Sequence, residues 1–256
     1  MERPDGNWKL CKNPPALFFA DMERRFSDAL RNTARQGQIP IIVDIKVYSP
    51  KAGDLLHGRS NTELALTFAT AGAPALAVIT EKDHFHGSLE SLRHVAAISN
   101  LPVLRKDFIT EHKELEATVQ AGAAAVLLIC SMHSPERLRT LFLIAHELGL
   151  EVLVETHTAQ ELEIALALGA KLIGINNKDI GKLESDDGAP TQMLNLIEQA
   201  AKHALIVSES GLQTRADVCA VIDAGADALL IGTALMQAED PAGFFRVLSK
   251  ARQKDD

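Results

Sequence analysis

The chain has 256 residues, of which 46% are hydrophobic, and a formal net charge of −8 at pH 7. This length fits one large α/β domain or two small ones, and the apolar share is enough for a full core. The acidic balance, without a cluster of Lys and Arg, argues against a nucleic-acid-binding face and indicates a soluble surface.

Cysteine usage and the N-terminal residues indicate a cytoplasmic protein. Cys11, Cys130 and Cys219 are far apart, odd in number and without metal-ligand spacing, so we expect reduced structural thiols. The N-terminal residues MERPDGNWKLCKNPP hold no apolar stretch of the kind found in a secretory signal. The longest apolar runs, such as AGAAAVLLIC, are far shorter than the ~20 residues that cross a bilayer, so we expect no membrane association.

Short β-branched runs alternate with amphipathic helical stretches after an N-terminal helix. The runs are continuously apolar, which is typical of parallel strands covered on both faces. We predict strands at residues 41–46, 76–80, 102–106, 125–129, 151–155, 172–176, 204–209 and 228–232.

The helices predicted between these strands carry local start signals. We expect Asn61 or Thr62 to be the N-cap of the first of them and Ser88 to be the N-cap of the second. Pro135 stands at a favoured first helical position, where its missing N–H is not needed.

A glycine tripeptide precedes every second predicted strand. Ala-Gly-Ala occurs at 71–73, 121–123 and 224–226, and Leu-Gly-Ala at 168–170. A left-handed glycine there ends a helix, and the repeat of about fifty residues corresponds to two βα units. Four such modules fit a closed barrel better than an open sheet, and no GxGxxG follows the first strand. We therefore predict one (β/α)8 TIM barrel domain over residues 1–256, with an N-terminal helical extension over residues 1–39.

Charged residues stand at the ends of the predicted strands, where a (β/α)8 barrel has its active site. Asp44 and Lys46 interrupt the apolar run IIVDIK and share one face, because side chains alternate along a strand. Lys106, Glu155 and Glu209 each share a face with an apolar residue two positions earlier. Since an unpaired buried charge costs several kcal/mol, we expect these five to meet and pair; a purely structural polar plug is the alternative. Other polar residues at strand ends are Thr80, Glu81, Arg105, Asp107, Asn176 and Asn177.

Two glycine-containing segments predict a phosphate site. SESG at 208–211 and IGTA at 231–234 follow the last two strands and place small residues before a helix. Backbone N–H groups at such positions bind anions, and barrels often bind phosphate there. The alternative is that these glycines only form turns.

The polar residues predict acid–base chemistry without a metal or an organic cofactor. The chain has no HExxH and no clustered Asp/His pattern, and we interpret His84 and His86 as loop residues; a metal or base role is the alternative. Lysines and glutamates in a partly dry mouth shift each other's pKa, so that one site supplies both an acid and a base.

Six segments carry a family resemblance: TEKDHFHGSLESL, LPVLRKDFI, LEVLVE, LGAKLIGINN, VSESG and ALLIGTALM. In this order and spacing they resemble the indole-3-glycerol-phosphate synthase family of tryptophan biosynthesis. The similarity runs from about Ile41 to Pro241. It implies a carboxy-lyase that converts 1-(2-carboxyphenylamino)-1-deoxyribulose 5-phosphate to indole-3-glycerol phosphate with loss of CO2 and water, and that needs no cofactor.

The resemblance also implies roles for single residues. Lys106 would be the general acid toward the substrate carbonyl, Glu155 the acid/base of the dehydration, and Lys46 a substrate contact that orders the charges. Further implied positions are Asp44, Asn176 and Glu209 in catalysis, Phe85, Phe108 and Lys178 in substrate binding, and Ser49, Ser210, Gly211, Gly232 and Thr233 in phosphate binding.

Three departures from the family keep other hypotheses open. The family usually has glutamate at the position of Asp44, a basic or small residue at Tyr48, and arginine at Lys178, which cannot make the same bidentate contact. A second hypothesis is therefore a diverged paralogue that acts on a related phosphorylated substrate, and a third is a non-catalytic barrel that binds a phosphorylated ligand. Lys106 and Glu155 favour an enzyme. We expect a small-molecule substrate and a monomer, with association with other pathway enzymes left open.

Overall fold

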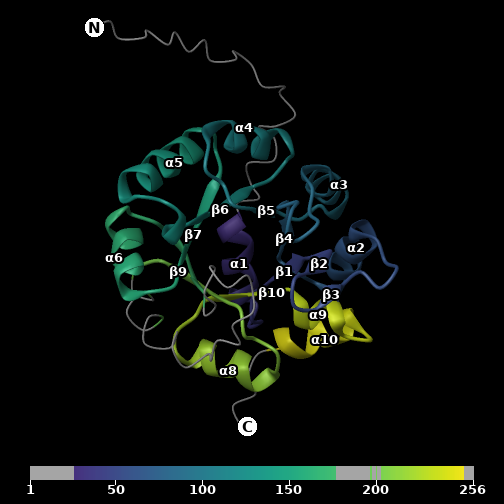
Figure 1. Ribbon diagram of the computed structural model, residues 1–256. Coiled ribbons are helices and arrows are strands. Elements are labelled where there is room, and N and C mark those ends of the chain that lie inside the picture. Colours follow the sequence, from purple (N-terminus) through teal and green to yellow (C-terminus); the bar gives the residue numbers. More distant parts are fainter. Residues whose placement is uncertain (1–25, 177–196, 198–199, 201–202, 251–256) are drawn as a thin grey trace, which may run out of the picture.

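The computed structural model describes residues 26–176, 197, 200 and 203–250, and within them eight parallel strands close into a barrel (Figure 1). The strands follow one another around the barrel in chain order, and the last pairs with the first. The predicted α/β TIM barrel is therefore confirmed, and each predicted strand agrees with an observed one to within one residue at either end. The barrel strands are β1 (Ile41–Ile45), β4 (Ala75–Ile79), β5 (Val103–Lys106), β6 (Ala125–Ile129), β7 (Glu151–Thr156), β8 (Leu172–Asn176), β9 (Leu205–Glu209) and β10 (Ala228–Ile231).

Apart from the first, the described helices surround the barrel in an outer ring (Figure 1). The predictions for Ser88 and Pro135 are confirmed, since Ser88 is the N-cap of α3 and Pro135 begins α5. No helix in the described ranges combines the length and apolarity needed to cross a bilayer. The helices are α1 (Phe26–Arg35), α2 (Asn61–Ala71), α3 (Leu89–Ser99), α4 (His112–Gln120), the 3-10 turn η2 (Cys130–Met132), α5 (Pro135–Glu147), α6 (Ala159–Ala167), α8 (Arg215–Asp223), α9 (Thr233–Gln237) and α10 (Pro241–Ser249).

The start of α2 differs from its prediction. Its N-cap is Ser60 and not Asn61 or Thr62. The Ser60 hydroxyl accepts a hydrogen bond from the N–H of Glu63 at 3.1 Å, and the Glu63 carboxylate accepts one from the N–H of Ser60 at 2.7 Å. This reciprocal pair satisfies two N–H groups that the helix leaves unbonded, and Asn61 as N-cap would have placed Leu64 instead of Glu63 at the matching position.

Left-handed glycines return the chain from helix to strand, as the repeated tripeptides predicted. Gly72, Gly122, Gly169 and Gly225 have φ values of 96°, 84°, 81° and 106°. Any other residue would be strained in this conformation. The four glycines therefore define where β4, β6, β8 and β10 begin.

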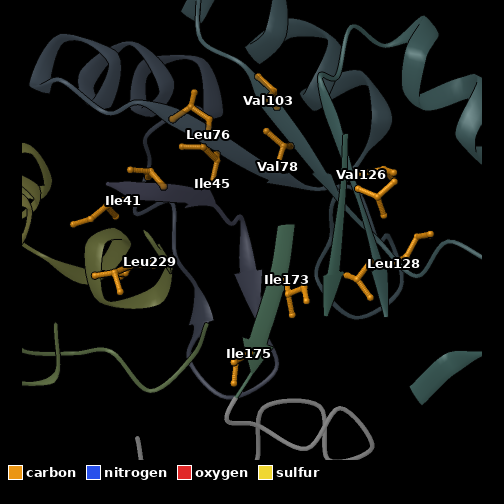
Figure 2. Close-up of a cluster of buried hydrophobic side chains, with 14 of the residues drawn as sticks. Ile41, Ile45, Leu76, Val78, Val103, Val126, Leu128, Ile173, Ile175 and Leu229 are labelled. Carbon is orange, nitrogen blue, oxygen red and sulfur yellow. The ribbon is translucent and has the colours of Figure 1, made fainter. Parts of the chain in front are cut away.

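Each barrel strand is buried on both faces, because successive side chains alternate between the helices and the barrel interior. The outward-facing residues, including Ile41, Ile45, Leu76 and Val78, pack in one hydrophobic cluster with the helices (Figure 2). Those that face the interior form a second cluster and include Ile42, Ala75, Ala77, Leu104, Ala125, Leu127, Ile129, Leu153, Leu172, Leu205, Val207, Ala228 and Leu230. The barrel is thus a packed core, and only the ends of its strands are free for polar residues.

Helix α1 closes the end of the barrel where the strands begin, and it lies inside the ring of strands in Figure 1. Phe26 and Leu30 are fully buried in the same cluster as the interior residue Ile42. The N–H of Ser27 donates to Oε1 of Glu151, the first residue of β7, at 3.1 Å. Part of the predicted extension therefore completes the core, while the domain limits at 1–39 and 1–256 reach beyond the described residues and stay predictions.

A small hairpin that the sequence did not predict follows β1. Its strands, β2 (Tyr48–Ser49) and β3 (Gly53–Asp54), pair antiparallel and have only two residues each, which is too short to show a period. The N–H of Leu55 donates to the carbonyl of Val47 at 2.9 Å and closes the hairpin. The hairpin lies just beyond the C-terminal end of β1 and so borders the mouth of the barrel.

The contribution of α1 to the core can be measured by truncating Leu30. We expect Leu30→Ala to lower the free energy of unfolding by about 2–5 kcal/mol, because it leaves a cavity at the base of the barrel. The matched control is Leu66→Ala in α2, where the side chain is 46% exposed and the expected change is within ~0.5 kcal/mol. Equal effects of the two substitutions in chemical denaturation would contradict the role of α1.

Candidate active site

Five charged residues predicted to meet at the mouth of the barrel lie on interior-facing positions at the C-terminal ends of its strands. Asp44 and Lys46 follow Ile42 on β1, while Lys106, Glu155 and Glu209 lie two residues beyond Leu104, Leu153 and Val207. Asp44, Lys46, Glu155 and Glu209 are at most 5% exposed. The negative charges of Glu155 and Asp44 and the positive charge of Lys106 all influence Glu209, so these four groups share one electrostatic environment.

Glu155 contacts two polar side chains, those of Asn176 and His157. Its Oε1 accepts a hydrogen bond from Nδ2 of Asn176 at 2.8 Å and lies 3.2 Å from Nε2 of His157. Burial opposes ionisation, but His157, Lys106 and Asn176 together hold the pKa of Glu155 below its ordinary value. Glu155 is therefore a carboxylate at neutral pH, able to accept a proton.

Glu209 has the opposite protonation preference. Burial, with the negative charges of Glu155 and Asp44, raises the pKa of Glu209 to about 8, although Lys106 and His157 act in the other direction. Within the described part of the chain, neither oxygen of its carboxyl group has a hydrogen-bond partner. Glu209 thus holds a proton at neutral pH beside an ionised Glu155, and two carboxyl groups kept in different states can divide acid and base roles.

Two glycines provide the space for the carboxyl groups. A Cβ at Gly174 on β8 would lie 2.1 Å from Oε1 of Glu209. A Cβ at Gly232, just beyond β10, would lie 3.0 Å from Cβ and 3.1 Å from Oδ2 of Asp44. Neither glycine has a positive φ, so the reason we infer for glycine at these positions is close packing. Gly174 was not among the site residues predicted from the sequence.

Aromatic residues gather on the side of the mouth formed by β4, β5 and the β2–β3 hairpin. The rings of Phe85 and Phe108 meet edge to face with centroids 6.5 Å apart, and Nζ of Lys46 lies 5.0 Å from the centroid of Phe85. Tyr48 stacks on His86 with centroids 4.1 Å apart. The structure thus brings the two predicted ring contacts, Phe85 and Phe108, next to a predicted catalytic lysine.

The two histidines after β4, His84 and His86, contact Glu81 and Tyr48. Nδ1 of His84 lies 3.3 Å from Oε1 of Glu81, and His86 stacks on Tyr48. The Glu81 carboxylate also accepts hydrogen bonds from the N–H groups of Asp83, His84 and Phe85. Glu81 therefore shapes the loop that carries Phe85. Among the described residues, no group of three or more His, Cys, Asp or Glu side chains could hold a metal ion.

Three other strand-end residues face away from the mouth. Arg105 lies between the interior-facing Leu104 and Lys106 and so points toward the helices. Its guanidinium donates to Thr80, Thr118 and Asp107 at 2.9, 2.9 and 2.8 Å. Arg105, Thr80 and Asp107 therefore link β4, β5 and α4 and contribute to the stability of the barrel.

The predicted phosphate-binding residues lie on neighbouring elements. Ser210 and Gly211 form a turn with φ values of 66° and 72° after β9, and Gly232 is the N-cap of α9, which begins at Thr233. The two turns are adjacent because Leu230 of β10 pairs with Glu209 of β9. Ser49 is buried on β2, in the hairpin after β1, the other neighbour of β10. As expected, SESG stands before a helix, with Leu212, Gln213 and the N-cap Thr214 between Gly211 and the start of α8 at Arg215. Lys178 and Asn177 lie outside the described residues.

His157, which contacts Glu155, and Glu161, which contacts His157, were not among the residues predicted from the sequence. His157 directly follows β7, and its ring lies between Glu155 and Glu161. The available signal was a histidine two residues after a strand-end glutamate, with a second glutamate one helical turn later. It went unrecognised because a lone histidine beside a strand end is common.

The space at Gly174 can be tested by a double-mutant cycle that needs no substrate. We expect Gly174→Ala to lower the free energy of unfolding by about 1–3 kcal/mol, because the new methyl group overlaps the carboxyl group of Glu209. In a Glu209→Ala background the same substitution should cost much less, since the overlapping group is gone. Chemical denaturation measures both values, and equal costs in the two backgrounds would contradict this explanation.

The family model for indole-3-glycerol phosphate synthase matches residues 15–248. Indole-3-glycerol phosphate synthase from Thermococcus kodakarensis is 47% identical over 208 residues, which are 81% of this chain and 91% of that protein. The synthase from Carboxydothermus hydrogenoformans is 39% identical over 241 residues, 94% of this chain and 90% of that protein. A structure of N-acetylmannosamine-6-phosphate 2-epimerase from Clostridium perfringens has a TM-score of 0.60 at 14% identity, over 76% of this chain and 86% of that chain, and supports the fold alone.

The matched region contains all eight barrel strands and every described residue of the candidate site. The resemblance inferred from six short segments is thereby confirmed over most of the chain. This chain belongs to the indole-3-glycerol phosphate synthase family.

Proposed function

We propose that this chain is an indole-3-glycerol phosphate synthase, which converts 1-(2-carboxyphenylamino)-1-deoxyribulose 5-phosphate to indole-3-glycerol phosphate, CO2 and water. One observation carries this beyond family membership. An ionised carboxylate on β7 and a protonated one on β9 lie at the same barrel mouth as a lysine on β5. Ring closure and dehydration of this substrate need these groups, since each is a proton transfer coupled to bond making or breaking.

Lys106 is proposed as the acid of the first step. Protonation of the substrate carbonyl oxygen by its ammonium group makes the carbonyl carbon electrophilic. The aromatic carbon that bears the carboxylate then attacks it, and loss of CO2 returns the bonding electrons to the ring. The negative charges of Glu155 and Asp44 around the same mouth favour the charged form of a neighbouring lysine.

Glu155 and Glu209 are proposed to act in the dehydration. Glu155, as a carboxylate, removes a proton from the closed-ring intermediate, while Glu209 donates its proton to the hydroxyl group that leaves as water. Asn176 orients Glu155 through its hydrogen bond to Oε1. Lys46 and Asp44 are proposed to contact the substrate and balance the charge. In ring closure, decarboxylation and dehydration the protein has to supply and remove only protons, so we propose no metal or organic cofactor.

The two ends of the substrate have proposed sites on different sides of the mouth. Phe85 and Phe108, after β4 and β5, would pack on the aromatic ring, with Lys178 as a further contact. The proposed phosphate site consists of Ser49, Ser210, Gly211, Gly232 and Thr233, near the ends of β1, β9 and β10. The substrate would then extend across the barrel axis, with its reacting carbons over Lys106, Glu155 and Glu209.

A monomer in the cytoplasm, with this phosphorylated small molecule as its partner, remains our proposal for the cellular setting. Association with other enzymes of the pathway is not required by the proposed chemistry. A single barrel domain spanning the chain likewise remains a proposal.

Asp44 favours one alternative, a diverged paralogue that acts on a related phosphorylated substrate. Its carboxylate is one methylene shorter than the family's usual glutamate, and Gly232 packs directly against it. Tyr48 adds a ring stacked on His86 beside the proposed aromatic site. Either feature alters the space for the substrate ring without altering Lys106, Glu155 or Glu209.

Fluorescence of the indole product tests the proposed function directly. We expect the wild-type protein to convert the carboxyphenylamino-deoxyribulose phosphate, and Lys106→Ala or Glu155→Gln to lower kcat by at least about 10²-fold, because each removes a proton-transfer group. Both variants should unfold as cooperatively as the wild type.

Matched controls separate this chemistry from general effects of charge. Lys171→Ala changes an exposed lysine before β8, at the opposite end of the barrel, and Glu163→Gln changes an exposed glutamate of α6. Both controls should keep kcat within about 3-fold, as expected for surface changes away from the site. A folded Lys106→Ala variant with wild-type turnover would refute its role, and a wild type without product at high protein concentration would refute the function.

A separate prediction distinguishes the synthase from the paralogue. If the short side chain of Asp44 limits the reaction by its reach, Asp44→Glu should raise kcat, by up to about 10²-fold for a correction near 1 Å. Asp44→Asn, which keeps the size and loses the charge, is the control and should lower kcat. Steady-state kinetics decide, and an unchanged or lower kcat in Asp44→Glu would mean that aspartate already suits the substrate.

A further inference from the structure

His157 occupies the position between two carboxylates at the start of α6. Its Nε2 lies 3.2 Å from Oε1 of Glu155, and its Nδ1 lies 3.4 Å from Oε2 of Glu161. The side chain of His157 is 13% exposed, and that of Glu155 is 2% exposed. The ring therefore lies between Glu161 of α6 and the buried carboxylate of Glu155 at the barrel mouth.

Glu161 is itself held in place by the start of the helix. Thr158 is the N-cap of α6, and its hydroxyl accepts a hydrogen bond from the N–H of Glu161 at 3.2 Å. The Glu161 carboxylate accepts a hydrogen bond from the backbone N–H of His157 at 2.6 Å. Glu161, a residue of helix α6, thus contacts the imidazole ring at Nδ1. A histidine held at one nitrogen can keep a group at its other nitrogen in a defined position.

We propose that His157 is a positioning residue of the reaction, held by Glu161 so that its ring fixes Oε1 of Glu155 and leaves Oε2 directed to the substrate. This inference rests on the proposed function, because Glu155 is the base in it. Oε1 accepts a hydrogen bond from Asn176 at 2.8 Å and lies within ion-pair distance of Nε2 of His157, at 3.2 Å. Oε2 is buried and has no hydrogen-bond partner within the described part of the chain, which suits an atom that must accept a proton.

The charge of the ring supports this arrangement. Burial alone would lower the pKa of His157, but Glu155 and Glu161 raise it to about 10. A protonated ring carries an N–H on both nitrogens. Each nitrogen of His157 lies within ion-pair distance of one carboxylate, without the alignment of a hydrogen bond. His157 would therefore remain a cation at neutral pH and keep Glu155 ionised.

Other titratable groups also surround Glu155 and Glu209. Lys106 on β5 also favours the ionised form of Glu155, while Glu209 on β9 holds a proton and adds no full charge at neutral pH. Cys130, after β6, is affected by Glu155 and Glu161, and burial raises its pKa to about 12, so it is neutral. Asp44 on β1 acts on Glu209. His157 lies within ion-pair distance of Glu155, with Nε2 3.2 Å from Oε1.

A purely structural histidine would also tie α6 to β7, so the test needs a readout that a structural role leaves unchanged. The pH profile of kcat provides it. Removal of a neighbouring positive charge raises the pKa of a carboxyl group by about 1–3 units, so Glu155 would lose its charge at higher pH. Because Glu155 acts as a base, the acidic side of the profile should move to higher pH by a similar amount.

Three variants separate position from charge. In His157→Gln the amide can still donate to Oε1 without a charge, so the acidic side should shift while the rate at high pH stays within about 3-fold of wild type. His157→Ala loses both the contact with Oε1 and the positive charge. We expect the same shift of the acidic side, with a kcat at high pH about 10–100-fold lower. Glu161→Gln releases the ring, and should give a smaller shift in the same direction. KM should change less than about 3-fold in all three, because none is proposed to bind the substrate.

The matched control is His94→Gln on α3. His94 forms the same kind of pair, with Nε2 3.0 Å from Oε1 of Glu90, but both side chains are more than half exposed. This variant should keep the wild-type pH profile. If His157→Ala does not fold, His157→Gln and Glu161→Gln carry the test. Acidic sides that stay within about 0.3 units of wild type in both would overturn the proposal.

A titration of the histidine rings in the free protein by NMR tests the charged contact without substrate. The resonance missing from His157→Gln identifies His157, and we expect it to stay protonated through about pH 8, above the value of about 6.5 for imidazole in a model peptide. Titration of His157 near pH 6.5 would overturn the proposal. If the wild type does not turn over the substrate, the proposed function is refuted and the catalytic role of His157 with it, whereas this titration still decides whether the charged contact exists.

Discussion

The burial of charge at the C-terminal mouth of the barrel is the constraint on which the candidate site depends. Lys46, Glu155 and Glu209 are at most 2% exposed, and an ion removed from water must either gain a partner of opposite charge or lose its own charge. Both outcomes occur among neighbours. Glu155 stays ionised beside His157 and Lys106, whereas Glu209 keeps a proton because burial and the negative charges of Glu155 and Asp44 raise its pKa to about 8. One barrel end thus contains an acid and a base of the same chemical type.

The alternation of side chains along the strands separates this site from the scaffold. Lys106 faces the interior, while the adjacent Arg105 faces the helices and links β4, β5 and α4. Small residues complete the separation, since Gly174 leaves the space that the carboxyl group of Glu209 occupies. Stability and proposed chemistry therefore depend on different faces of the same short strands, which allows residues at the mouth to change without loss of the barrel.

The order of strands around the barrel also arranges the proposed substrate contacts. Phe85 and Phe108 follow β4 and β5, and the proposed phosphate residues other than Ser49 follow β9 and β10. Between the two groups lies β1, with Asp44 and Lys46 at its end and Ser49 in the hairpin beyond it. The departures from the family at Asp44 and Tyr48 thus lie where the two parts of the substrate would join. This explains why family membership is clear while these positions are the sensitive test of substrate choice.

The sequence by itself determined the strands, most helix ends and the interior-facing positions of Asp44, Lys46, Lys106, Glu155 and Glu209, because burial on both faces, glycine turns and strand alternation are local properties of the chain. The predicted N-cap of α2, Asn61 or Thr62, was wrong, because Ser60 forms reciprocal hydrogen bonds with Glu63 and is the N-cap instead. The hairpin of two-residue strands was not predicted. Only the tertiary structure decided that His157 and Glu161 support Glu155, that Gly174 makes room for Glu209, and which carboxyl group is charged. A pKa depends on exclusion of water and on charges from several strands, and those distances do not exist until the barrel closes.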